Sequence, residues 1–219
     1  MQSTFTRQAS RALNGLIVIF LIVVSFHSFG FLFKTPLNST ASSWELNLTP
    51  REEYTGHAIH KATAREMLEG KLYFPSLITL GVDYDLQLYN GVAFTNWGYG
   101  VPLLELPFHA IAYLYEPWRP LFFFPDRIIF ALYLTGLVLC LWNSIRIVVR
   151  STWSNYPSPI QDIVAGVSVF SILTYSLYWI ISLRLTVYEE TIAYLIICQL
   201  YVLSFYFQYF QSRKEKWLL

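Results

Sequence analysis

Glutamate and histidine side chains recur at helical spacing early in the chain. In "PREEYTGHAIHKATAREMLEG", Glu53, His57 and His60 are three or four residues apart, so a helix would place them on one face. Carboxylate and imidazole groups are ligands for divalent metals, and this face could hold one such ion. The same spacing is also typical of a solvated helix surface on which Glu and His pair with each other.

A second acidic group, Glu189 and Glu190, stands between two long apolar runs in "SLRLTVYEETIAYLI". Carboxylates avoid lipid, so the pair can simply end one helix and favour the N-terminus of the next through the helix dipole. Arg184, six residues before Glu190, is either an interfacial anchor or a phosphate ligand. Asp83 and Asp85 face the same way if their segment is extended, although such residues also commonly solubilise turns and loops. What these groups do depends on the elements that position them.

The composition is that of a membrane protein. Of 219 residues, 55% are hydrophobic and only 13% are charged, and the mean hydropathy is +0.42, well outside the usual soluble range. The net charge is +1, and no basic run interleaved with aromatic residues occurs, which excludes a nucleic-acid partner. We expect an all-α, polytopic membrane protein that forms a single membrane domain over residues 1–219.

Four apolar runs are long enough to cross a bilayer as helices. They cover about residues 12–33, 124–148, 163–183 and 191–209. The first run follows Arg7 and Arg11 and is too long for the core of a signal peptide, so it predicts an uncleaved signal anchor.

A fifth apolar segment, "YGVPLLELPFHAIAYLYEP", is shorter and carries Pro102, Glu105 and Pro107. An acid and two prolines are costly in lipid. This segment therefore predicts a helix over about 101–116 that lies at the membrane interface, with Glu105 as a further candidate site residue.

Lysine and arginine beside short loops favour the cytoplasmic side of a membrane. With four spans, every basic cluster lies there; the clusters are Arg7 and Arg11, Arg146 and Arg150, and Arg213, Lys214 and Lys216. Both termini are then cytoplasmic, and residues 34–123 form one large extracytoplasmic loop. A helix over about 51–69, ended by Gly70, is predicted within this loop.

The order of these features resembles the N-terminal part of the polytopic GT-C-type glycosyltransferases, the class that includes the protein O-mannosyltransferases and the lipid A aminoarabinose transferase. The resemblance is carried by a first span, an acidic outer loop with "AREMLEGKLYFP", the Pro-bearing segment, the Arg-led span "PDRIIFALYLTGLVLCLW" and the acid-bearing turn "SLRLTVYEETIAYL". In that family a sugar is transferred outside the cytoplasm from a polyprenyl-phosphate donor. The resemblance implies the same activity and the same class of donor for this chain.

The resemblance assigns the first-loop acid to Glu53, with Glu52 as the alternative, and the second acid to Glu189 or Glu190. The family usually has Asp at the first position, where this chain has Glu-Glu. A basic residue often found before the Pro-bearing segment is replaced by "NWGYG", residues 96–100. Family members have many more spans, so the resemblance implies a fragment, a subunit that needs a partner, or a truncated relative.

The chemistry implied is proton removal by a carboxylate and stabilisation of the departing polyprenyl phosphate by positive charge. Glu53, His57 and Glu190 would hold a divalent ion (Mg, Mn or Zn), and Arg184 would contact the donor phosphate. The hypothesis requires Glu53 and the Glu189–Glu190 pair to converge. The alternative is a noncatalytic four-span protein that serves as an assembly partner. A carrier or channel is disfavoured, because the middle of the four spans holds no ionisable residue.

Overall fold

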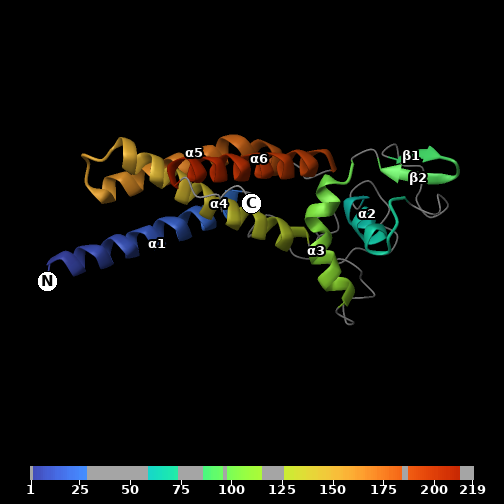
Figure 1. Cartoon of the computed structure of the whole chain (residues 1–219), viewed down its shortest axis with the longest axis horizontal. Helices are drawn as coiled ribbons and strands as arrows, with labels where there is room; N and C mark the ends of the chain where they lie inside the picture. The colour runs from blue at the N-terminus through green and yellow to red at the C-terminus, as the bar shows by residue number, and fades with distance from the viewer. Residues whose placement is uncertain are drawn as a thin grey trace. The chain divides into compact units, whose positions relative to one another are not determined.

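The computed structural model describes residues 2–28, 59–73, 86–95, 98–114, 126–183 and 187–212. This part of the chain is mostly helical, as predicted, but it also contains one β-hairpin, which the expectation of an all-α fold did not include (Figure 1). The elements in chain order are α1 (Gln2–Ser28), α2 (Ile59–Leu68), β1 (Leu86–Tyr89), β2 (Val92–Thr95), α3 (Gly100–Leu114), α4 (Asp126–Thr152), α5 (Ser158–Leu183) and α6 (Val187–Ser212).

The chain divides into two compact units. The bundle unit comprises residues 1–34, 131–182 and 195–219, and the loop unit comprises residues 35–130 and 183–194. The boundary between the two units falls inside α4 and inside α6, so each of these helices contributes to both units.

Within the described residues, three helical stretches are long and apolar enough to cross a membrane. They are Ile129–Thr152, Ser158–Leu177 and Thr191–Gln211, as expected for a multi-pass integral membrane protein. Helix α1 contains a shorter apolar stretch, Ala12–Ser25.

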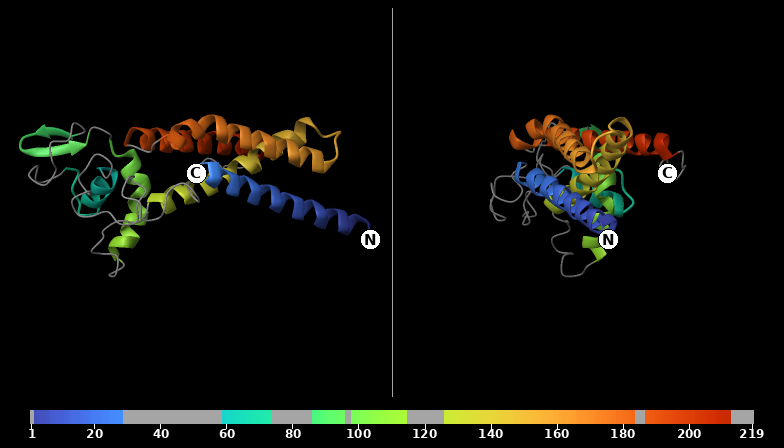
Figure 2. Two further views of the ribbon diagram at one scale, coloured as in Figure 1. Left: turned by 180° about the vertical axis from the view of Figure 1, so that it is seen from behind. Right: turned by 90° about the vertical axis from the view of Figure 1, so that its left-hand side faces the viewer.

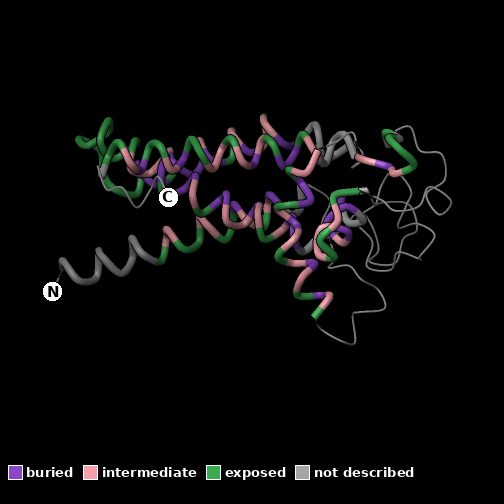
Figure 3. The backbone as a smooth tube through the Cα atoms, turned by 45° about the vertical axis from the view of Figure 1, so that its right-hand side comes forward, coloured by how far each residue is buried: buried purple, intermediate pink, exposed green. Residues whose placement is uncertain are grey.

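Helix α4 forms much of the core of the bundle unit. Leu134, Leu137, Val138 and Leu141 are buried at helical spacing on one face of α4, and buried residues recur along this helix in Figure 3. Gly166 of α5 allows close packing against α1, because a Cβ at this position would lie 2.9 Å from Ile17 Cγ2.

Hydrogen bonds also join α4 to α6 in the bundle unit. The Gln208 amide donates to Ser144 Oγ at 2.9 Å, and the Tyr201 hydroxyl donates to the Tyr133 carbonyl at 2.8 Å. Gly136 leaves the space that the Tyr201 hydroxyl occupies. Polar pairs and small residues of this kind hold helices together in lipid, where apolar side chains gain little from leaving the surrounding tails.

In the loop unit, α2 ends in a Schellman motif. Gly70 has a φ of 76°, which glycine adopts without the steric cost that a Cβ adds. The Gly70 amide donates to the Met67 carbonyl at 3.0 Å, and the Lys71 amide donates to the Glu66 carbonyl at 2.8 Å. The chain thus turns sharply away from the helix at Gly70.

The hairpin pairs β1 and β2 antiparallel, with Tyr89 opposite Val92, and Figure 2 shows it from the side opposite to Figure 1. Asn90 and Gly91 form its two-residue turn, and both have positive φ values, 50° and 81°, as a type I′ turn requires. Phe94 of β2 lies 6.3 Å, ring centre to ring centre, from Tyr73, so the hairpin packs on the segment that follows α2.

Candidate functional site

Several residues predicted to form the site lie outside the residues that the structure describes: Glu52, Glu53, His57, Asp83, Asp85 and Arg184. The backbone of Glu189 and Glu190 is described and lies in the first turn of α6, where the helix dipole favours carboxylates. Their side chains are outside the described part. The convergence of Glu53 with this pair therefore stays a prediction.

A hydrogen bond connects α2 to the start of α6 inside the loop unit. His60 Nε2 lies 3.0 Å from Thr191 Oγ1, and Thr191 directly follows Glu190 in the chain. Tyr194, one turn further along α6, is buried and meets the Phe130 ring edge-on at 5.7 Å. These contacts fix the first turns of α6 against α2 and against the beginning of α4.

Helix α2 buries polar side chains. His60, Thr63 and Glu66 are each at most 7% exposed, and Ala64 is fully buried beside them. For His60 the interpretation as part of a solvated helix surface is therefore wrong, because this histidine faces the interior. Spacing alone could not reveal this, since the sequence around His60 offers no strong apolar stripe to define which face is buried.

Helix α3 packs against α2 and also buries ionisable groups. Glu105 and His109 are both 0% exposed, on a buried face that also carries Val101, Pro102 and Ala112. His109 Nε2 lies 3.5 Å from Glu105 Oε2, a long hydrogen bond between residues one helical turn apart. The sequence marked Glu105 as a candidate, and its spacing to His109 was the signal that could have added the histidine.

A buried carboxylate and imidazole can share one proton without a net charge. Either His109 or Glu105 can carry that proton. Such a pair is suited to accept or deliver a proton at a site that excludes water. The loop unit thus contains a buried Glu–His pair, of which only Glu105 was a candidate from the sequence.

At the end of α2, the pKa values of two neighbouring carboxyl groups, Glu66 and Glu69, are shifted in opposite directions. Burial raises the pKa of Glu66, because the loss of hydration outweighs the opposing attraction of the Lys71 ammonium, which lies 3.7 Å from Glu66 Oε2. The hydrogen bond that Lys71 donates to Glu69, at 2.7 Å, lowers the pKa of Glu69 and raises that of Lys71. Glu69 therefore serves as the surface partner of Lys71.

Within the described ranges, no three His, Cys, Asp or Glu side chains come together as a metal site. Two of the predicted ligands, Glu53 and His57, fall outside those ranges, and the side chain of the third, Glu190, does so as well. The metal ion stays a prediction.

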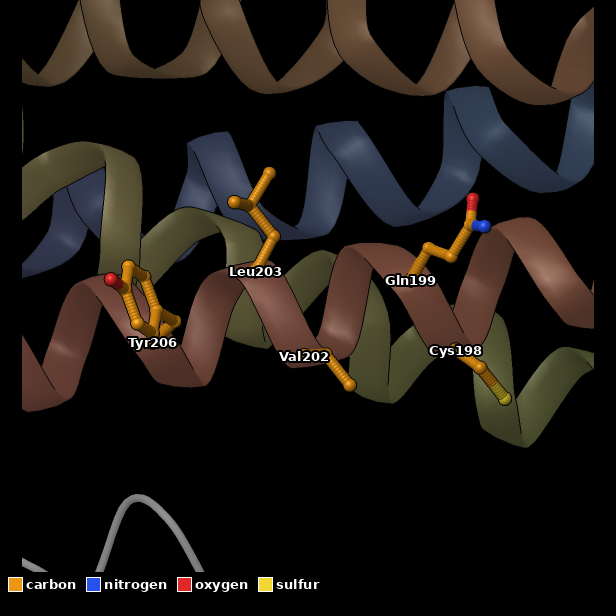
Figure 4. Close-up of a pocket in the computed structure, with 5 residues that line it drawn as sticks. All are labelled: Cys198, Gln199, Val202, Leu203 and Tyr206. Carbon is orange, nitrogen blue, oxygen red and sulfur yellow. The ribbon is translucent and has the colours of Figure 1, made fainter.

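An open depression of about 380 Å³ lies on α6 in the bundle unit and is lined by Cys198, Gln199, Val202, Leu203 and Tyr206 (Figure 4). Its lining is almost wholly apolar and belongs to a stretch that is long enough to span a membrane. Lipid tails suit such a surface better than a polar substrate does. The loop unit, with its buried polar residues, is the better candidate site.

Comparison with protein-family models, with curated proteins and with solved structures finds no match.

Proposed function

We propose that the chain is a membrane glycosyltransferase of the GT-C type, or the N-terminal part of one. It transfers a sugar from a polyprenyl-phosphate donor to an acceptor on the extracytoplasmic face. In this proposal α1, α4, α5 and α6 are four spans, both termini are cytoplasmic, and α2, the hairpin and α3 belong to the outer loop. The observation that carries the proposal is the hydrogen bond between His60 and Thr191.

This bond connects two residues that lie close in the sequence to the two acidic groups, one to each group. Thr191 follows Glu190, and His60 lies seven residues after Glu53, which corresponds to about 10 Å if the intervening residues are helical. If the predicted helix extends back to Glu53, the Glu53 side chain can approach the first turn of α6. The bond therefore supports a two-part site made from residues that precede α2 and residues at the start of α6.

The chemistry divides between a base and a source of positive charge. A carboxylate, Glu53 in this proposal, takes the acceptor's proton as the acceptor oxygen attacks the anomeric carbon. The bond from that carbon to the phosphate oxygen breaks, and the polyprenyl phosphate leaves as an anion. Arg184 stabilises that anion, and Glu53, His57 and Glu190 are the residues that would hold a divalent ion, which would supply further positive charge. Glu105 and His109 provide a second proton-transfer pair in the same unit.

The test uses membranes from cells that express the full chain. Tritiated polyprenyl-phosphate mannose, glucose and aminoarabinose are supplied in turn, and consumption of the donor and labelling of the acceptor are measured. We expect Glu53→Gln to reduce transfer about 100-fold or more. Glu69→Gln is the matched control, because Glu69 is the surface partner of Lys71, and this variant should keep full activity.

Full activity of Glu53→Gln would remove Glu53 from the site. No donor consumed by the wild type across the panel would instead favour the noncatalytic four-span protein. The sidedness is tested separately with exposed residues: Gln87→Cys should react with a membrane-impermeant maleimide in intact cells. Ser154→Cys, in the turn between α4 and α5, should react only after permeabilisation.

A further inference from the structure

An ion cluster joins α4 to α5 at one end of the bundle unit. Asp162 of α5 is fully buried, and its Oδ1 accepts hydrogen bonds from Arg146 Nε at 2.8 Å and from an Arg150 terminal nitrogen at 3.3 Å. The two arginines lie one turn apart on α4. One carboxylate therefore faces two guanidinium groups.

Among the described residues, the cluster carries one positive charge more than Asp162 neutralises. Asp162 neutralises one of the two arginines, and the Arg150 side chain is 42% exposed while that of Arg146 is 24% exposed. Arg146 offers only Nε to Asp162, and the described residues provide no other acceptor for the terminal nitrogens of Arg146. The Trp142 ring lies 5.8 Å from the Arg146 guanidinium and restricts it further. The contacts of Arg146 with Asp162 and with the Trp142 ring thus hold its terminal N–H groups in fixed directions.

The cluster lies at the ends of two apolar stretches, Ile129–Thr152 and Ser158–Leu177. The turn between them carries Trp153 and Tyr156, whose rings lie 5.1 Å apart and are 41% and 54% exposed. The buried Gln161 amide donates to the carbonyls of both residues, at 2.8 and 2.9 Å, which holds the turn in shape. Exposed Trp and Tyr at the end of a span are typical of the headgroup layer.

We propose that Arg146 and Arg150 bind the phosphate of an anionic phospholipid, beside an aromatic rim formed by Trp153 and Tyr156. A second arginine is not needed to neutralise Asp162, and a guanidinium fork matches the oxygens of a phosphate. Basic pockets between membrane helices bind anionic headgroups in this way. The ligand comes from the leaflet that faces this turn, because the donors lie at the ends of two apolar stretches long enough to cross a membrane.

The test measures lipid retention by the purified full chain. The protein is delipidated in mild detergent and titrated with phosphatidylglycerol or phosphatidylcholine, and the bound lipid is counted by native mass spectrometry. We expect the wild type to prefer phosphatidylglycerol. Arg150→Gln should weaken phosphatidylglycerol binding about fivefold, since one basic residue near the surface contributes about that factor. Lys71→Gln, which removes one positive charge from the loop unit, should leave the binding unchanged.

Arg150→Gln keeps the shorter Arg146–Asp162 contact, so the fold is expected to survive, and circular dichroism checks this. Arg150→Lys keeps the charge but not the fork, and it should lie between the wild type and Arg150→Gln. An unchanged preference in Arg150→Gln, or an equal loss in Lys71→Gln, would overturn the proposal. Displacement of phosphatidylglycerol by millimolar inorganic phosphate would overturn the lipid as the source and assign the arginines to soluble phosphate.

Discussion

Replacing Gly136 with alanine should loosen the packing of α4 against α6. An alanine Cβ at this position would overlap the Tyr201 hydroxyl, which donates a hydrogen bond to the Tyr133 carbonyl at 2.8 Å. The hydroxyl must move, so the variant loses this bond as well as the close fit. Both helices belong to the bundle unit at this level.

Three contributions set the size of the effect. Overpacking costs about 1–3 kcal/mol, and an interhelical hydrogen bond in a membrane contributes about 0.6 kcal/mol. Alanine is favoured over glycine inside a helix by about 1 kcal/mol, which acts in the opposite direction. The net loss is about 1.5 kcal/mol, or a fall in Tm of roughly 3–6 °C for a chain of this size.

The hydroxyl provides an internal control. In Tyr201→Phe the overlapping oxygen is absent, and the next ring atom would lie 3.4 Å from the new Cβ, close to ordinary contact. The double variant Gly136→Ala/Tyr201→Phe should then be at least as stable as Tyr201→Phe alone. The measurement is thermal unfolding in detergent at a fixed scan rate, followed by fluorescence-detected size exclusion. A Gly136→Ala protein as stable as the wild type, or no rescue by Tyr201→Phe, would refute the packing argument.

Three further variants test the loop unit. Thr191→Val should lower the free energy of unfolding by about 1 kcal/mol and speed hydrogen exchange in α2. Combined with His60→Ala it should cause little further loss, because the two side chains form one contact. Additive losses in the double variant would count against the hydrogen bond. Gly70→Ala should cost about 1 kcal/mol in thermal unfolding because of the positive φ, and Gly70→Asn less. For Glu66 the raised pKa means that the folded protein binds the proton more tightly than the unfolded chain. Wild-type stability should therefore fall relative to Glu66→Gln as the pH rises from the ordinary carboxyl pKa through the raised one, which a pH series of Tm values measures; a flat difference would contradict the assignment.

Hydrophobicity predicted the long helices but not all of their ends. The last apolar run begins near residue 191, whereas α6 begins at Val187. The helix extends further because Glu189 and Glu190 are too polar for lipid yet favourable in the first turn of a helix. An apolar run measures the part of a helix that lipid tolerates, and local capping decides where the helix itself starts.

The hairpin was missed although its signal was present. Asn90-Gly91 stands between "LQLY" and "VAFT", and Asn-Gly between alternating apolar residues strongly favours a type I′ turn. This segment falls in the predicted extracytoplasmic loop, in which no strand was predicted. The positive φ values of Asn90 and Gly91 show that these two residues form a turn between two strands.

The candidate site was harder to predict, because burial depends on which helices meet. Nothing within α2 alone distinguishes His60 as buried, and the face became clear only where α2 packs against α3 and bonds to Thr191. Glu105 looked costly for lipid, which correctly made it notable. Its pairing with His109 required knowing that both residues point to the interior.

Stability alone does not explain the polar interior of the loop unit. His60, Glu66, Glu105 and His109 are buried, and apolar side chains of similar volume would often pack there as well or better, because buried ionisable groups lose their hydration. The bundle unit also buries polar side chains, but Asp162 there is paired with Arg146 and Arg150, and the others are uncharged Ser and Gln side chains. The buried carboxylates and imidazoles of the loop unit suit proton transfer at a water-poor site, which supports a chemical role for this unit. The acids that the resemblance singles out, Glu53 and the Glu189–Glu190 pair, flank this interior in the chain, so the proposed reaction and the unusual burial point to the same part of the molecule.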